Sequence, residues 1–313
     1  MGTAVIHVGV SKTATTTLQQ NVFERLNGVL YLGKPGPHDR HRIVDEFSKE
    51  HSALLERTLE GMVAGHVCPR EDIETLRMAI ENLKARDASI VYSNELLAEN
   101  KYLSFAEIAA GLRDIFGASE LLVTVRDPQT ALPSAYMDEI LRFPDSYLCF
   151  PKWLDDAIAN PRRINRRAES LEQYRYALML KEFRAVFEEI TVLQYEDLVA
   201  TPPAFSARLA RLIGVDPKTI ESLLSLPPKN PTRSELFYRY RTFVNRLRST
   251  VPFLDLSSFS IARKLNNAIE TFTKKLPKKS VPLSERDRAR IAQFFPYPVT
   301  EREWRTNGEQ DTT

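Results

Sequence analysis

Short apolar runs, many of them β-branched, recur along the chain and alternate with longer amphipathic stretches. The runs predict strands near Thr3–Gly9, Gly28–Leu32, Ser89–Ser93, Glu120–Val125 and Glu189–Gln194. Helical spacing separates most of them, as at Arg70–Arg86 and Tyr102–Phe116. Because strands that alternate with helices build parallel sheets, the pattern predicts an α/β fold in which helices flank a central parallel sheet.

A proline-rich segment, Leu226–Pro231, divides this pattern in two. We expect residues 1–226 to form the α/β core and residues 227–313 to form a helical extension of the same domain. The extension is rich in Lys and Arg, although the whole chain carries a net charge of only +2. Two interpretations stay open for this basic region: a solvated helical face, or a wall that attracts an anionic ligand.

The composition bounds the class of protein. The chain has 313 residues, enough to bury a large core, and its two cysteines, Cys68 and Cys149, do not make a disulfide framework. The sequence shows no apolar run of about 20 residues and no leader-like opening. We therefore expect a soluble, cytoplasmic protein.

The strongest local signal follows the first strand. Gly9 is followed by the loop Ser11-Lys12-Thr13-Ala14-Thr15-Thr16, and helical spacing begins at once. The first N–H groups of a helix have no partner inside the helix, so together with the Lys12 ammonium they suit a phosphate or a sulfonate. The alternative is that Thr13 or Thr15 merely caps the helix. The loop is not a Walker A motif, because no glycine precedes Lys12.

A second signal lies at the end of the predicted strand Glu120–Val125. Arg126-Asp127-Pro128 follows it, and a helical stretch runs on to about Arg142 and contains Ser134. Pro128 suits the first position of a helix. Arg126 is placed at the carboxyl end of a strand, where open α/β sheets bind ligands.

Together these two segments resemble the sulfotransferases that use 3′-phosphoadenosine-5′-phosphosulfate (PAPS). The Lys12 loop resembles the 5′-phosphosulfate loop of that family, and Arg126-Asp127-Pro128 with Ser134 and Tyr136 resembles its 3′-phosphate motif. The resemblance covers about residues 3 to 215 and is closest to the bacterial and carbohydrate-type branches. It implies a P-loop-like three-layer fold. The family usually has glycine where this chain has Ala14, and we expect alanine to be tolerated if the backbone there stays right-handed.

The resemblance also implies roles for individual residues. The loop residues Ser11 to Thr16 would hold the 5′-phosphate and Lys12 would neutralise the leaving oxygen, while Arg126 and Ser134 would hold the 3′-phosphate. Glu95, which follows the predicted strand Ser89–Ser93, would take the acceptor proton, as a glutamate does in related carbohydrate-type enzymes. The alternative is that Ser93 caps the next helix and Glu95 only decorates its first turn.

The implied reaction moves the sulfuryl group from PAPS to a hydroxyl of a glycan, glycolipid or small metabolite and releases 3′,5′-bisphosphoadenosine (PAP). No metal is required, because protein cations balance the charge. Two other functions stay open: a P-loop kinase, which needs Mg²⁺, and a non-catalytic protein that binds PAP. We expect no nucleic-acid partner, because the basic region lacks a recognisable module.

Three further features have mainly structural interpretations. His7 lies inside the first strand and is read as a packed histidine rather than a base. Tyr174 and Tyr176 are read either as stacking partners for adenine or as core residues. A basic stretch is read either as an acceptor contact or as solvated surface; it comprises Arg162, Arg163, Arg166 and Arg167.

Overall fold

The chain divides into two compact units. A computed structural model describes residues 2–33, 47–143, 146–163, 170–227, 235–250, 268–269, 271 and 281–297. The first unit comprises residues 1–127, 172–229 and 296–313, and the second comprises residues 128–171 and 230–295. The predicted boundary between residues 226 and 227 stays a prediction.

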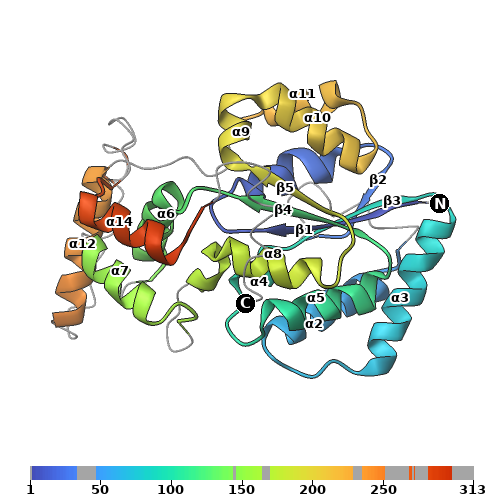
Figure 1. The fold of residues 1–313 in the computed structure, drawn as a ribbon, viewed down its shortest axis with the longest axis horizontal. Coiled ribbons are helices and arrows are strands. Elements are labelled where there is room, and N and C mark those ends of the chain that lie inside the picture. Colours follow the sequence, from blue (N-terminus) through green and yellow to red (C-terminus); the bar gives the residue numbers. More distant parts are fainter. Residues whose placement is uncertain are drawn as a thin grey trace, which may run out of the picture. The chain divides into compact units, whose positions relative to one another are not determined.

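The first unit is built on one parallel sheet of five strands in the order β2-β3-β1-β4-β5 (Figure 1). The strands are β1 (Ala4–Gly9), β2 (Val29–Tyr31), β3 (Ser89–Ser93), β4 (Glu120–Val125) and β5 (Ile190–Gln194). Each lies within one residue of its prediction at either end. The predicted parallel α/β fold is thereby confirmed, and it follows from the near-continuous apolar runs that buried parallel strands require.

Helices cover both faces of this sheet, so the unit has three layers (Figure 1). One face packs against the helical segments that follow β1 and against α10 (Pro202–Ile213) and α11 (Pro217–Leu224). One buried residue of each strand meets these helices in a single apolar cluster. Among its members are Val5, Leu18, Phe23, Val91, Leu122, Leu193, Phe205, Leu209 and Ile220.

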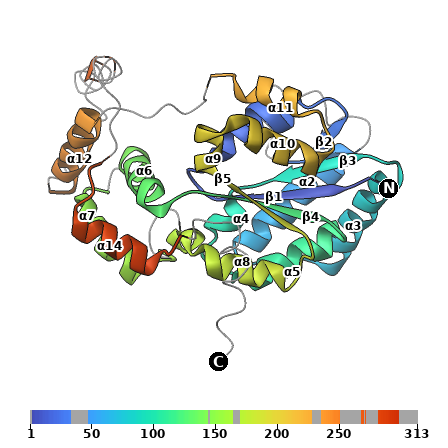
Figure 2. The same cartoon turned by 45° about the horizontal axis from the view of Figure 1, so that its top comes forward.

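The opposite face is covered by the helices that connect the other strands. They are α2 (Lys49–Val63), α3 (Arg70–Ala85), α5 (Phe105–Phe116) and α8 (Tyr176–Arg184), with the short α4 (Leu96–Glu99) after β3 (Figure 2). The α5 helix begins three residues later than predicted, because Ser104 and Glu107 form a capping box that fixes its start. Phe116 of α5 packs on Tyr92 of β3, with ring centroids 5.1 Å apart.

The second unit is helical where the structure describes it. Its main helices are α6 (Pro128–Arg142), α7 (Phe150–Ala159), α12 (Glu235–Thr250) and α14 (Glu285–Phe294). The α6 helix begins and ends where the sequence predicted. Asn245 joins α12 to α6 and the loop after it, because its side-chain NH2 donates to the carbonyl groups of Ile140 and Ser146, each at 2.9 Å, and lies 3.3 Å from that of Phe143.

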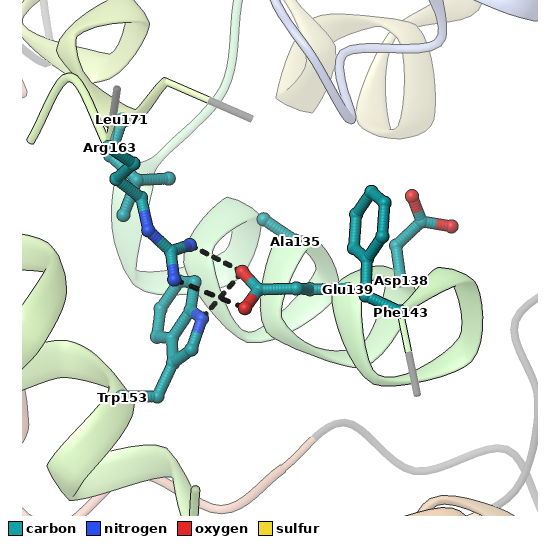
Figure 3. A pocket seen from close by; sticks show the side chains of 7 residues that line it. All are labelled: Ala135, Asp138, Glu139, Phe143, Trp153, Arg163 and Leu171. Carbon is teal, nitrogen blue, oxygen red and sulfur yellow. Dashed lines mark hydrogen bonds and ion pairs between the residues drawn. The ribbon is translucent and has the colours of Figure 1, made fainter. Parts of the chain in front are cut away.

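A buried ion pair organises the middle of the second unit. Glu139 on α6 receives two hydrogen bonds from the Arg163 guanidinium and one, at 2.8 Å, from the Trp153 indole (Figure 3). Arg163 is only 3% exposed, so neither interpretation of the basic stretch holds for it: it is a core residue whose charge is balanced by Glu139. Arg166 and Arg167 lie outside the described residues. In the described part of the chain, no helix is both long enough and apolar enough to cross a membrane.

Candidate functional site

The Lys12 loop lies at the carboxyl edge of the sheet, on its central strand. It joins β1 to a helical stretch that starts as α1 (Thr15–Thr17) and continues through Arg25 as a π-helical and then a 3₁₀ segment. The strands on either side of β1 are β3 and β4, so the chain changes direction across the sheet at this point. Such a switch point is where open α/β sheets leave a crevice for a ligand.

The loop backbone is left-handed at two positions that are not glycine. Lys12 has φ 65° and Ala14 has φ 66°. The condition under which alanine would be tolerated, a right-handed backbone at Ala14, is therefore not met, because the turn from β1 into α1 needs a residue in the left-handed region just before the helix. A side chain there is strained, and this is the conformational reason for glycine at such a position.

The loop side chains divide into an inner and an outer set. Ser11, Thr13 and Thr15 are buried, whereas Lys12, Ala14 and Thr16 are partly exposed. The hydroxyl groups of Thr13 and Thr15 both donate to the carbonyl oxygen of Val10, at 2.6 and 3.1 Å.

Neither threonine therefore caps the helix, and that alternative is wrong. The N-cap position belongs to Ala14, which has no side chain to accept a hydrogen bond. The side chains of the outer residues are accessible to a ligand, whereas those of the inner residues are buried.

Gly9, the last residue of β1, is required by close packing. A Cβ atom placed there would lie 2.5 Å from the side chain of Thr15 and 3.0 Å from the imidazole of His7. The loop thus folds back tightly over the end of its own strand, and this brings Thr15 against β1.

The second predicted motif meets the first one directly. Arg126 follows β4, and its Nη1 atom donates to the carbonyl oxygen of Lys12 at 2.9 Å. Its guanidinium also lies over the ring of Tyr195, 4.3 Å from the centroid. Two segments that are 114 residues apart in the sequence therefore share one edge of the sheet, and each contributes a cation to it.

The backbone around Arg126 is clamped by buried side chains. The Tyr176 hydroxyl accepts from the Arg126 N–H at 3.2 Å and donates to the Arg126 carbonyl at 2.8 Å. Burial raises the pKa of Tyr176, which keeps the phenol protonated so that it can donate.

The residue after Arg126, Asp127, is held in a similar way by the helix that follows β5 and by Tyr297. Glu196, the second residue of α9 (Tyr195–Ala200), accepts from the Asp127 N–H at 3.0 Å and from the Tyr297 hydroxyl at 2.9 Å. Burial and the neighbouring Glu196 carboxylate raise the pKa of Tyr297, so that this phenol also stays protonated. Glu196 thus supports the second motif rather than only its own helix.

The sequence did not reveal the residues that hold Ser11. The Ser11 N–H donates to Oε1 of Gln173 at 2.8 Å, and the Tyr174 hydroxyl donates to the Ser11 carbonyl at 3.3 Å. Tyr174 and Tyr176 are fully buried, so stacking on adenine is wrong for both and the core interpretation is confirmed. Residues 173–176 reach both motifs at once, and no local pattern in the sequence marks that role.

Glu95 lies at the same sheet edge, after the strand next to β1. It occupies the N-cap position of α4 and is partly exposed. Ser93 does not cap this helix, because its hydroxyl is buried and turned toward His7; the Leu96 N–H donates instead to the Asn94 side chain. A proton-accepting role for Glu95 stays a prediction.

Ser134 belongs to the second unit. It lies on α6 and is partly exposed. The structure therefore joins Arg126 to the Lys12 loop within the first unit, while the role of Ser134 stays a prediction. Among the residues that the structure describes, no three His, Cys, Asp or Glu side chains gather as a metal ion would require.

Comparisons with known proteins find similarity only among solved structures. No protein-family model matches the chain, and no curated protein matches it. Among solved structures, a sulfotransferase from Alicyclobacillus acidocaldarius matches with 18% identity and a TM-score of 0.44, over 84% of this chain and 99% of that one. The sulfotransferase domain of the Synechococcus PCC 7002 olefin synthase matches with 15% identity and a TM-score of 0.43, over 96% of both chains.

A third match comes from the curacin biosynthetic pathway. Its sulfotransferase domain shows 16% identity and a TM-score of 0.39, over 96% of this chain and 99% of that one. All three are sulfotransferases or sulfotransferase domains. At identities of 15–18%, these matches do not determine the activity of this chain, which depends on its own site residues.

Proposed function

We propose that this protein is a PAPS-dependent sulfotransferase that modifies a hydroxyl group of a glycan, glycolipid or small metabolite. The observation that carries the proposal is the contact between Arg126 and the Lys12 carbonyl. It brings a phosphate-type loop and a second cationic motif to one edge of a parallel sheet. A ligand with two separated anionic groups, such as PAPS, suits this arrangement better than a ligand with one.

In this proposal the loop holds the 5′ end of the donor. Backbone N–H groups from Thr13 to Thr17 would bind the 5′-phosphate, and the Lys12 ammonium would lie at the bridging oxygen. Arg126, with Ser134, would bind the 3′-phosphate. Because that phosphate is remote from the sulfur atom, its binding energy can align the donor for transfer.

The chemical step breaks the bond between sulfur and the bridging oxygen and forms one between sulfur and the acceptor oxygen. The acceptor proton would pass to the Glu95 carboxylate, and PAP would leave with the electron pair of the broken bond. Lys12 would stabilise the charge that develops on the leaving oxygen. Removal of Lys12 is therefore expected to lower the rate by about 10²–10³, as the loss of an oxyanion-hole donor does.

The test begins with binding and proceeds to transfer. PAP is titrated into the protein in a calorimeter, with ADP and Mg²⁺ in a parallel titration. Micromolar binding of PAP that Lys12→Ala weakens supports the proposal. It is followed by a screen of hydroxyl acceptors with sulfur-labelled PAPS, in which Glu95→Gln should bind PAP but transfer no label.

Three other outcomes would count against the proposal. A folded protein that does not bind PAP at millimolar concentration contradicts it. Turnover of ATP that depends on Mg²⁺ favours a kinase instead. Binding of PAP without transfer to any acceptor favours a non-catalytic protein of the same fold.

A further inference from the structure

A chain of buried polar side chains runs beneath the Lys12 loop and crosses three strands. His7 of β1 contacts Ser93 of β3 through Nδ1, at 2.7 Å, and Thr124 of β4 through Nε2, at 3.1 Å. Thr124 continues to the Thr13 hydroxyl at 2.8 Å, and the Gln19 amide reaches Ser93 at 3.1 Å. All five side chains are buried, and His7 is 0% exposed.

The direction of every hydrogen bond in this chain follows from its end at Val10. The Thr13 hydroxyl has one proton and three oxygen neighbours, of which the Val10 carbonyl is nearest, at 2.6 Å, against 2.8 Å for Thr124 and 3.3 Å for Thr15. Because a carbonyl oxygen only accepts, we place the Thr13 proton on this shortest contact. Thr13 must then accept from the Thr124 hydroxyl. Thr124, whose proton is now used, must accept from Nε2–H of His7.

The same reasoning fixes the other side of the imidazole. Burial lowers the pKa of His7 to about 3, so the ring is neutral at physiological pH and carries one proton. With that proton on Nε2, Nδ1 must accept from the Ser93 hydroxyl. Ser93 in turn accepts from the Gln19 amide, which only donates.

The hydrogen bonds thus all run in one direction: each group donates to the next, from the Gln19 amide to the Val10 carbonyl. We propose that His7, as its Nε2–H tautomer, is a positioning residue that fixes the Lys12 loop through Thr124 and Thr13. The chain ties the first helical stretch, β3, β1 and β4 to the point where the loop leaves its strand. The role of this tie in donor binding rests on the sulfotransferase proposal, whereas the tie itself does not.

The surroundings of the imidazole fit a fixed tautomer rather than a proton-transfer group. Its described contacts are the hydroxyls of Ser93 and Thr124 and the ring of Phe23, whose centroid lies 5.4 Å away. None of these titrates near neutral pH. A second proton on His7 would also reverse the contact with Ser93 and break this series of hydrogen bonds.

The tautomer is tested by NMR of the full chain with ¹⁵N-labelled histidine. The protein has five histidines, and the His7→Gln variant identifies the resonances of His7. We expect the Nε2–H pattern, unchanged between pH 5.5 and 8. Either an Nδ1–H pattern or a titration in this range overturns the inference.

The positioning role is tested by two substitutions at Thr124. Thr124→Val removes the hydroxyl at constant volume, and Thr124→Ser keeps it. Because Thr124→Val leaves buried donors and acceptors unpaired, amide exchange should accelerate by about ten-fold or more at Ser11 and Leu18, with little change in Thr124→Ser. The N–H groups of these two residues are protected in the wild type by hydrogen bonds to Gln173 and to the Ala14 carbonyl. Thr191→Val, on β5 and away from the chain, controls for the loss of a strand hydroxyl.

Equal exchange in the two Thr124 variants overturns the positioning role. PAP affinity is measured in the same variants, and Thr124→Val should bind about ten-fold more weakly than Thr124→Ser. If the wild type binds no PAP, the proposed function fails, while the tautomer and the exchange rates still decide this inference. If the wild type binds PAP and both variants bind it equally, the positioning role fails alone.

Discussion

The guanidinium of Arg126 donates to the carbonyl oxygen of Lys12 at a distance of 2.9 Å. Lys12 lies in a left-handed conformation, which sets the direction of that carbonyl. The contact therefore joins the backbone of the first motif to the side chain of the second. A substitution at either residue should therefore shift the position of the other.

The strained alanine of the loop gives the first prediction. Ala14 has φ 66°, where a side chain costs about 1 kcal/mol or more. We expect Ala14→Gly to raise the free energy of unfolding by up to about 1 kcal/mol, because relief of strain exceeds the added flexibility of the unfolded chain. Urea unfolding measures it.

A matched control has the opposite sign. Ala53 lies exposed inside α2, where glycine should lower the free energy of unfolding by about 1 kcal/mol. If Ala14→Gly destabilises the protein as much as Ala53→Gly does, the left-handed strain at Ala14 is not a cost that glycine relieves.

The buried histidine gives a prediction for pH. The pKa of His7 is about 3 when folded and near 6.5 when unfolded, so the unfolded chain binds the extra proton first. The contribution of His7 is complete above about pH 6.5 and is lost as the pH falls toward 3. At pH 5 the loss relative to pH 7 should be about 2 kcal/mol.

The His7→Gln variant isolates this effect. It lacks the titrating group, so its free energy of unfolding should change by about 2 kcal/mol less between pH 7 and pH 5. Urea unfolding of both proteins at the two pH values gives the difference. Parallel pH profiles would mean that His7 titrates alike in the folded and unfolded chains.

The buried ion pair of the second unit gives a prediction for stability. Glu139→Ala removes two hydrogen bonds from the buried Arg163 guanidinium and leaves it with the Asp156 carboxylate, 3.6 Å away, so it should cost about 3 kcal/mol. The control is on the same helix: Arg142 pairs with Asp138 at 2.7 Å but is 57% exposed, so Arg142→Ala should cost less than about 1 kcal/mol. Similar losses in the two variants, measured by urea unfolding, would contradict a structural role for the pair.

The strands and the location of the site were predictable because they depend on local patterns. Buried parallel strands need unbroken apolar runs, and β3 and β4 begin and end at the predicted residues. The place of Lys12 and Arg126 then follows, since the carboxyl ends of neighbouring parallel strands share one edge.

The supports of the site were not predictable, because they depend on contacts between distant residues. Gln173 accepts a hydrogen bond from the Ser11 N–H, although the two residues are 162 positions apart. The sequence around either residue gives no sign of this contact. Arg163 looked like surface in a basic stretch, and only the fold supplies Glu139 to bury it. The left-handed turn at Ala14 could not be predicted from the sequence, because alanine rarely adopts it.

The most direct test of the central claim compares two ligands that differ by one phosphate. Calorimetry measures the affinities of PAP and 5′-AMP for the wild type and for Arg126→Ala, with the exposed Arg77→Ala as a control. If Lys12 and Arg126 form one donor site, the wild type and Arg77→Ala prefer PAP strongly, and Arg126→Ala binds the two ligands about equally. An unchanged preference for PAP in Arg126→Ala would contradict the claim.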